Sequence, residues 1–238
     1  MKKELSSAKK TARIAGLLYF ILAITGAFSM IYVPSILIVP GDATVTVKNI
    51  VTNESLFRLG IVSGLACQVL FIFLVLELYK LFKAVNKKQA LLMVALVVAS
   101  VPIACFNMIN QFAVLLLLSD ANYLSAFTPD QLNAFVMLFL DLSNKGILIA
   151  ELFWGLWLFP FGWLVIKSGF IPKILGVFLI IGCFCYLLEF HMNALFPDYA
   201  NAVSQIIAIP MAISELSIVL WLLIKGVKEP QPLRSEVN

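Results

Sequence analysis

Long apolar stretches recur along this chain, and each is long enough to cross a lipid bilayer as a helix. The hydrocarbon core of a bilayer is about 30 Å thick, so a helix rising about 1.5 Å per residue needs about 20 mainly apolar residues to cross it. With 62% hydrophobic and 13% charged residues, the 238-residue chain has too little polar surface for a water-soluble globule. The runs are continuous and lack the alternation that barrel strands need. The sequence therefore predicts an all-α fold, a polytopic membrane helix bundle.

We expect six transmembrane helices in a single membrane domain that covers residues 1–226. The expected spans are residues 12–35, 56–82, 90–118, 145–166, 173–194 and 203–224, each with approximate ends. The polar, proline-containing residues 227–238 are predicted to form a disordered tail. An even number of spans puts both chain ends on the same side of the membrane.

Two further helices are predicted from their N-terminal caps. Asp42 is expected to cap a short surface helix that runs through Val51. Thr128 as N-cap and Pro129 in the first turn predict another helix that begins near residue 130. Because polar side chains interrupt the apolar pattern over residues 130–144, we expect that part to lie at the membrane interface, just before the fourth span.

The lysines and arginines are distributed unevenly between the two sides of the predicted bundle. Of the 17, only Lys48, Arg58 and Lys145 fall on the side away from the termini. The positive-inside rule therefore predicts that both termini are cytoplasmic. The basic residues form a fringe along the membrane surface and no clustered face, which argues against a nucleic-acid partner despite the net charge of +4.

Polar side chains inside the predicted spans share helix faces with small residues. On the fifth span, Glu189 lies on the same face as Gly182 and Tyr186. Small residues allow helices to approach closely, so this pattern is typical of a helix–helix contact and not of a surface that faces lipid. The other polar side chains with such neighbours are Gln68, Asn107, Asn110, Gln111, Glu151 and Glu215.

We expect most of these polar groups to line one polar cleft that faces outward. An ionised carboxylate at the bilayer centre costs about 2.5 to 3.5 kcal/mol, so three glutamates inside spans call for a hydrated or paired setting. The predicted lining residues are Glu151, Glu189, Glu215, Asn107, Asn110, Gln111 and Arg58. The candidate cationic partners of Glu215 are Lys145, Arg58 and His191. An alternative remains open, in which the amides only hold helices together.

The sequence predicts no metal site and no cofactor. It lacks an H-E-x-x-H pair, a G-x-S-x-G elbow, a Walker loop and a dinucleotide fingerprint. Its one histidine, His191, is two residues from Glu189 and nearly opposite it on a helix, so a solvated or capping role is expected. Four cysteines without C-x-x-C spacing are expected to be small buried residues: Cys67, Cys105, Cys183 and Cys185.

Four stretches of the chain together resemble a known family. They are Arg13 to Tyr19 (RIAGLLY), Asn53 to Arg58 (NESLFR), Lys167 to Gly176 (KSGFIPKILG), and Trp221-Leu222 before Lys225-Gly226. These stretches are similar to bacterial membrane proteins grouped as domain-of-unknown-function family 4386, over almost the whole chain. The resemblance implies a six-span protein of the bacterial inner membrane. It implies no activity and carries over no catalytic residue.

Three functions of different classes follow from these patterns. The first is binding or transport of a small polar solute, a cation or a lipid headgroup through the outward cleft. The second is a structural or assembly partner, whose small-residue stripe at Gly60 and Gly64 would contact another protein. The third is an intramembrane enzyme that uses a carboxylate pair on a lipid-linked substrate. We expect them in that order, with an enzyme the least favoured, and with membrane lipids as neighbours in every case.

Overall fold

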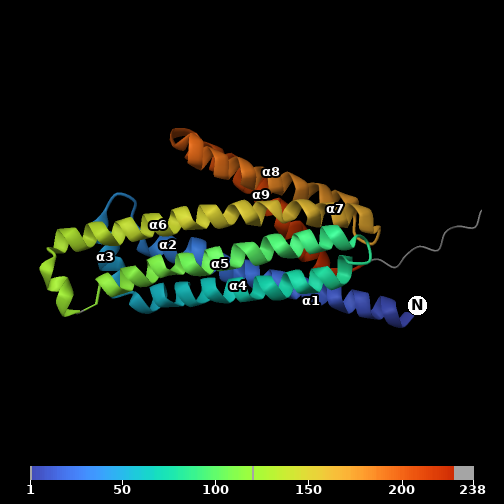
Figure 1. The fold of residues 1–238 in the computed structure, drawn as a ribbon, viewed down its shortest axis with the longest axis horizontal. Coiled ribbons are helices and arrows are strands. Elements are labelled where there is room, and N and C mark those ends of the chain that lie inside the picture. The colour runs from blue at the N-terminus through green and yellow to red at the C-terminus, as the bar shows by residue number, and fades with distance from the viewer. Residues whose placement is uncertain (1, 120, 228–238) are drawn as a thin grey trace, which may run out of the picture. The chain divides into compact units, whose positions relative to one another are not determined.

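A computed structural model describes residues 2–119 and 121–227 of the chain, and all regular structure in these residues is helical (Figure 1). Six helical segments are long and apolar enough to cross a membrane: Ser7–Leu37, Glu54–Phe82, Lys87–Leu117, Pro129–Ser168, Lys173–Leu195 and Pro197–Ile224. The predicted membrane helix bundle with six spans is therefore confirmed. The cytoplasmic location of the termini stays a prediction. The tail expected over residues 227–238 lies, apart from Val227, outside the described residues.

The chain divides into two compact units, and four helices contribute residues to both. Unit 1 contains the described residues of 1–20, 73–97 and 154–238, and unit 2 contains residues 21–72 and 98–153 apart from residue 120. The boundaries fall inside α1 (Lys2–Ala27), α4 (Glu54–Phe82), α5 (Lys87–Leu117) and α6 (Pro129–Leu156). The single domain over residues 1–226 stays a prediction.

In unit 1, three helices follow one another along the chain and pack in sequence. Helix α7 (Leu158–Ser168) lies against α8 (Lys173–Leu195), and α8 lies against α9 (Pro197–Ile224) (Figure 1). A glycine pair allows α7 and α8 to approach, because a Cβ at Gly162 would lie 2.6 Å from the carbonyl oxygen of Gly176. Gly169, with φ of +72°, ends α7 in the left-handed conformation that glycine adopts without strain.

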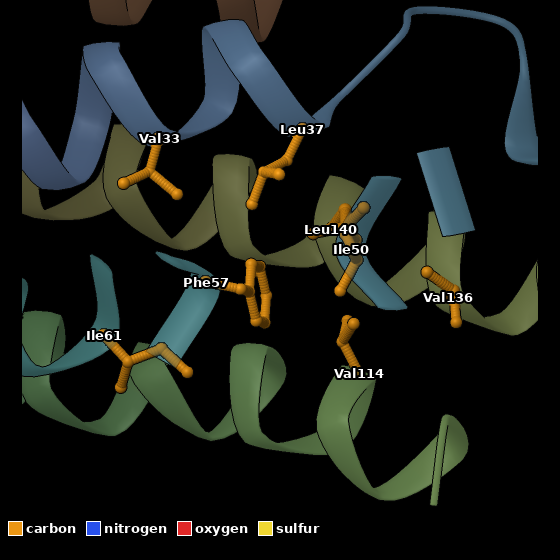
Figure 2. Packing of buried hydrophobic residues seen from close by; sticks show 8 residues of the cluster. All are labelled: Val33, Leu37, Ile50, Phe57, Ile61, Val114, Val136 and Leu140. Carbon is orange, nitrogen blue, oxygen red and sulfur yellow. The ribbon is translucent and has the colours of Figure 1, made fainter. Parts of the chain in front are cut away.

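In unit 2, the end of the first span packs with α3 (Ala43–Thr52) and with parts of α4, α5 and α6. The first span changes from α1 into the π-turn η1 (Phe28–Tyr32) and then into α2 (Val33–Leu37). Figure 2 shows the core of this unit, to which α2, α3, α4, α5 and α6 each contribute side chains. Its buried side chains are Val33, Leu37, Ile50, Phe57, Ile61, Val114, Val136 and Leu140.

Both predicted helix caps are present. The Asp42 carboxylate accepts a hydrogen bond from the Val45 N–H at 2.9 Å, and α3 continues one residue beyond the predicted end at Val51. Thr128 Oγ1 accepts a hydrogen bond from the Gln131 N–H, and the Gln131 side chain accepts one from the Thr128 N–H. This reciprocal pair of bonds is a capping box, and it begins α6 at Pro129.

Helix α6 runs without a break through the expected junction between an interfacial helix and the fourth span. The interruption comes later, at Trp157, between α6 and α7. Its cause is Pro160, which has no N–H to donate to the carbonyl of Leu156. Where the bilayer begins along α6 stays a prediction.

The small-residue stripe of α4 packs inside unit 2. A Cβ at Gly60 would lie 3.1 Å from the side chain of Val33, and a Cβ at Gly64 would lie 2.6 Å from the methyl group of Met108. The stripe therefore serves contacts within the chain. The structure describes a single chain, so the assembly-partner alternative stays a prediction.

Candidate functional site

In unit 1, Glu215 of α9 lies between two tyrosines that come from different helices. Tyr19 of α1 donates its phenolic hydrogen to Oε2 of Glu215 at 2.6 Å. Tyr186 of α8 donates to Oε1 at 2.7 Å. Each carboxylate oxygen thus has its own phenol, and the partners that Glu215 finds in unit 1 are hydroxyl groups and not the predicted cation.

Close helix packing brings these three side chains together. Gly182 of α8 faces Ser214 of α9 so closely that a Cβ at Gly182 would overlap the Ser214 side chain. One turn further along α8, Tyr186 therefore reaches Glu215. The ring of Tyr19 also contacts Trp157, with ring centroids 5.9 Å apart. The predicted face of Gly182 and Tyr186 is thus a polar helix contact.

Two other polar residues of α8, Glu189 and His191, do not contact Glu215. His191 is exposed, and its Nδ1 lies 2.6 Å from the carbonyl oxygen of Leu187, so His191 as a partner of Glu215 is wrong. The half-buried side chain of Glu189 makes no hydrogen bond or ion pair with another described residue. Its place in a shared cleft stays a prediction.

In unit 2, three predicted amides and one serine form a hydrogen-bonded group between α5 and α6. Asn107 Nδ2 donates to the carbonyl oxygen of Ser143 at 2.8 Å, and Asn110 Nδ2 donates to Asn107 Oδ1 at 2.9 Å. Gln111 Nε2 reaches Ser143 Oγ at 3.4 Å, which is a weak contact. We call Asn107, Asn110, Gln111 and Ser143 the amide network. The sequence predicted that the three amides share a site, but not their partner Ser143.

Gly146 of α6 makes the amide network possible. A Cβ at this position would overlap Oδ1 and Cγ of Asn107. Glycine therefore leaves the space in which the Asn107 side chain turns toward Ser143. Gly146 is not among the predicted site residues, although Ser143, Gly146 and Ala150 form a small-residue stripe with the same helical spacing as on the other spans.

The amide network borders a small cavity, which we call the polar cavity. Its volume is about 40 Å³, enough for about two or three water molecules. Four of its lining residues carry polar side chains: Ser29, Gln111, Ser143 and Asn144. The rest of its wall is formed by Val33, Pro34, Leu37, Ile38, Phe57, Gly60 and Leu140.

The π-turn of the first span leaves the backbone carbonyl of Ser29, a residue that lines the polar cavity, without a helical N–H donor in its register. In this turn the Val33 N–H bonds to the carbonyl oxygen of Phe28, five residues back. In the same register, the hydrogen-bond donor for the Ser29 carbonyl would be the N–H of residue 34. That residue is Pro34, which has no N–H. Ser29 and Pro34 both line the cavity, and Ser29 is only 7% exposed. Such π-turns occur frequently at functional sites.

The same network also borders a wide, open groove of about 560 Å³. Asn107, Asn110 and Gly146 line it together with the apolar residues Pro102, Ile103, Phe106, Ile109 and Ile149. Phe106 is 75% exposed, so the groove presents a mainly apolar surface with two amides in it. The amide network is thus shared by a small polar cavity and a larger apolar groove.

The remaining predicted residues lie elsewhere in unit 2. Arg58 is on the exposed surface of α4, where its Nε lies 2.6 Å from Glu54 Oε1, and it does not line the polar cavity. Glu151 is half-buried on α6. A single cleft that contains all three glutamates stays a prediction, as does the carboxylate pair of the enzyme alternative.

The chemistry available at the polar cavity is that of neutral oxygen and amide groups. No carboxylate, histidine or cysteine lines it, and in residues 2–119 and 121–227 no three such side chains gather in a metal-binding group. The four cysteines form no disulfide; Cys67 and Cys183 are buried, as expected, whereas Cys105 and Cys185 are only half-buried. The cavity can therefore hold water or a small cation among hydroxyl and amide groups.

Comparison with known proteins gives one match. A family model described as "Domain of unknown function (DUF4386)" matches residues 14–226. The match covers all six helical spans in whole or in large part, and every residue of the amide network and the polar cavity. The chain matches no curated protein and no solved structure.

Proposed function

Since this chain is a multi-pass membrane protein that belongs to the DUF4386 family, whose description assigns no activity, we propose its function from the site itself. The protein binds a small monovalent cation at the polar cavity of unit 2, as a step in transport across the membrane. We place it in the bacterial inner membrane with both termini cytoplasmic. In that orientation the cavity lies near the outer ends of the first four spans.

The observation that carries this proposal is the set of oxygens around the cavity. The hydroxyls of Ser29 and Ser143 and the amide oxygens of Gln111 and Asn144 belong to residues that line it. Gln111 donates through Nε2, which leaves its Oε1 as an acceptor. We infer that the Ser29 carbonyl, which faces Pro34 and not an N–H in the π-turn register, supplies a fifth oxygen. Hard cations prefer oxygen ligands, and carbonyls released from helical bonding coordinate Na⁺ in many transporters.

The charge of the lining residues and the volume of the cavity limit which cations can bind there. Divalent cations are usually held by carboxylates, and none lines the cavity, so a monovalent ion is the better match. A volume of about 40 Å³ accommodates an ion with little or no bound water, but not a sugar or an amino acid. Among the classes expected from the sequence, a cation therefore fits this cavity best.

Thermal unfolding of the purified full-length protein in detergent tests the proposal. We expect NaCl to raise the Tm relative to choline chloride at the same ionic strength. Sodium at ten times its Kd would stabilise the protein by about 1.4 kcal/mol, which corresponds to a rise of about 3 to 6 °C. Equal Tm values in the two salts would contradict the proposal.

A pair of serine variants locates the effect. Ser143→Ala removes a cavity hydroxyl, so we expect the sodium-dependent rise in Tm to disappear. Ser125→Ala is the matched control, because Ser125 lies outside the cavity and its hydroxyl donates only to the nearby Asn122 carbonyl. Loss of the sodium effect in both variants, or in neither, would place the ion elsewhere.

A further inference from the structure

A second opening lies in unit 1, where the beginning of α1 meets the end of α9. It is an open groove of about 570 Å³. Its lining residues are Lys9, Lys10, Arg13, Ile14, Leu17 and Leu223. Half of them are cationic and half are aliphatic; the cationic residues precede Ile14 and Leu17 along α1, and Leu223 belongs to α9. The groove is thus basic at one end and apolar at the other.

The walls of this groove are held in place by close packing. A Cβ at Gly16 would overlap the backbone of α9 at Leu223, so α1 and α9 touch through their main chains. Arg13 Nη2 also lies 3.4 Å from the carbonyl oxygen of Ile224. This single long contact orients the guanidinium beside the end of α9 and leaves its other N–H groups available.

Among residues 7–119 and 121–227, whose side chains the structure describes, no carboxylate forms an ion pair with Lys9, Lys10 or Arg13. Three cations at one site repel one another, and a bound anion would remove that repulsion. Because the charges stand at the polar end of a transmembrane helix, the anion that meets them there is a lipid headgroup.

We propose that this groove binds an anionic phospholipid. The lipid phosphate contacts Lys9, Lys10 and Arg13, and the first part of an acyl chain lies along Ile14, Leu17 and Leu223. A soluble phosphate would match the charges but would leave the aliphatic half of the groove unfilled, whereas an anionic phospholipid matches both halves. The site is separate from the polar cavity and does not depend on cation binding there.

Native mass spectrometry of the purified full-length protein tests this proposal without any variant. After delipidation, phosphatidylglycerol and phosphatidylcholine with the same acyl chains are added in equal amounts. We expect phosphatidylglycerol to bind at least tenfold more tightly, and glycerol phosphate at millimolar concentration not to displace it. Equal binding of the two lipids would overturn the proposal, and displacement by glycerol phosphate would assign the site to a soluble anion.

Single variants in the charged half and in the aliphatic half of the groove then locate the site. We expect Arg13→Gln to weaken phosphatidylglycerol binding about fivefold, the effect of one basic residue near a membrane surface. Leu17→Ser should weaken both lipids without changing the charge. Lys88→Gln is the matched control, because Lys88 also belongs to the basic fringe but does not line the groove. If Lys88→Gln weakens binding as much as Arg13→Gln, the whole fringe attracts lipid and the specific site is disproved.

Discussion

At the scale of single residues, the amide of Asn107 occupies space that any side chain at position 146 would take. Asn107 is 5% exposed and Ser143 is 4% exposed, so the bond between them is shielded from solvent. A buried amide without partners is costly, so the network depends on Gly146 as much as on the amides themselves. This dependence can be measured against Gly26, a helical glycine where an added Cβ would make only an ordinary contact.

Gly146→Ala should destabilise the protein, although alanine is the better helix former. The new methyl group would displace the Asn107 side chain, and we expect a loss of about 1 to 3 kcal/mol in the free energy of unfolding. Gly26→Ala is the control, since a Cβ there would lie 3.5 Å from Cys67 Sγ, an ordinary contact. It should be neutral or stabilising by up to about 1 kcal/mol. Denaturant unfolding in detergent measures both, and equal stability of the two variants would count against the amide network.

At the scale of helices, Glu215 joins three of them. Tyr19 brings α1 to the carboxylate and Tyr186 brings α8, while Glu215 itself belongs to α9. Each carboxyl oxygen of Glu215 has one phenol as its hydrogen-bond partner, so this group contributes to the packing of unit 1. Loss of one phenol would leave one carboxylate oxygen without its donor.

Tyr19→Phe and Tyr186→Phe should each lower the free energy of unfolding by about 1 to 3 kcal/mol. In a Glu215→Leu background the same changes should cost much less, because the acceptor is already absent. Tyr199→Phe, on the exposed surface of α9, serves as the control and should be neutral within about 0.5 kcal/mol. Additive effects in the double variants would show that the phenols act independently of Glu215.

Local patterns in the sequence predicted the helices and their caps, but not which helices meet. Asp42 and Thr128 act on residues within one turn, so their neighbours along the chain were enough to predict them. The bond from Tyr19 to Glu215 joins residues 196 positions apart. Helical spacing indicated that Tyr186 and Asn107 lie on contact faces. The spacing could not show that Tyr186 meets the Glu215 carboxylate or that Asn107 meets the Ser143 carbonyl, because each partner belongs to another helix.

At the scale of the whole molecule, the side of the membrane that each proposed site faces depends on how the six spans are oriented. The uneven distribution of lysine and arginine predicts that the termini and the turn at Lys87 are cytoplasmic, and that Tyr123 is outside. With this orientation, the chain ends that line the basic groove are predicted to meet the cytoplasmic leaflet. Both proposals are consistent with this arrangement.

Reporter fusions test the orientation. A fluorescent protein fused after Lys87 should be fluorescent, and alkaline phosphatase fused after Tyr123, whose side chain is 64% exposed, should be active. The exchanged fusions provide the control and should both be inactive. Activity of the same reporter at both positions would overturn the six-span topology.

Binding of a monovalent cation among the oxygens of the polar cavity is tested most directly by equilibrium binding of radioactive sodium to the purified protein. We predict saturable binding of one ion per chain, lost in Ser143→Ala and retained in Ser125→Ala. Binding that does not saturate, or that persists unchanged in Ser143→Ala, would contradict the claim.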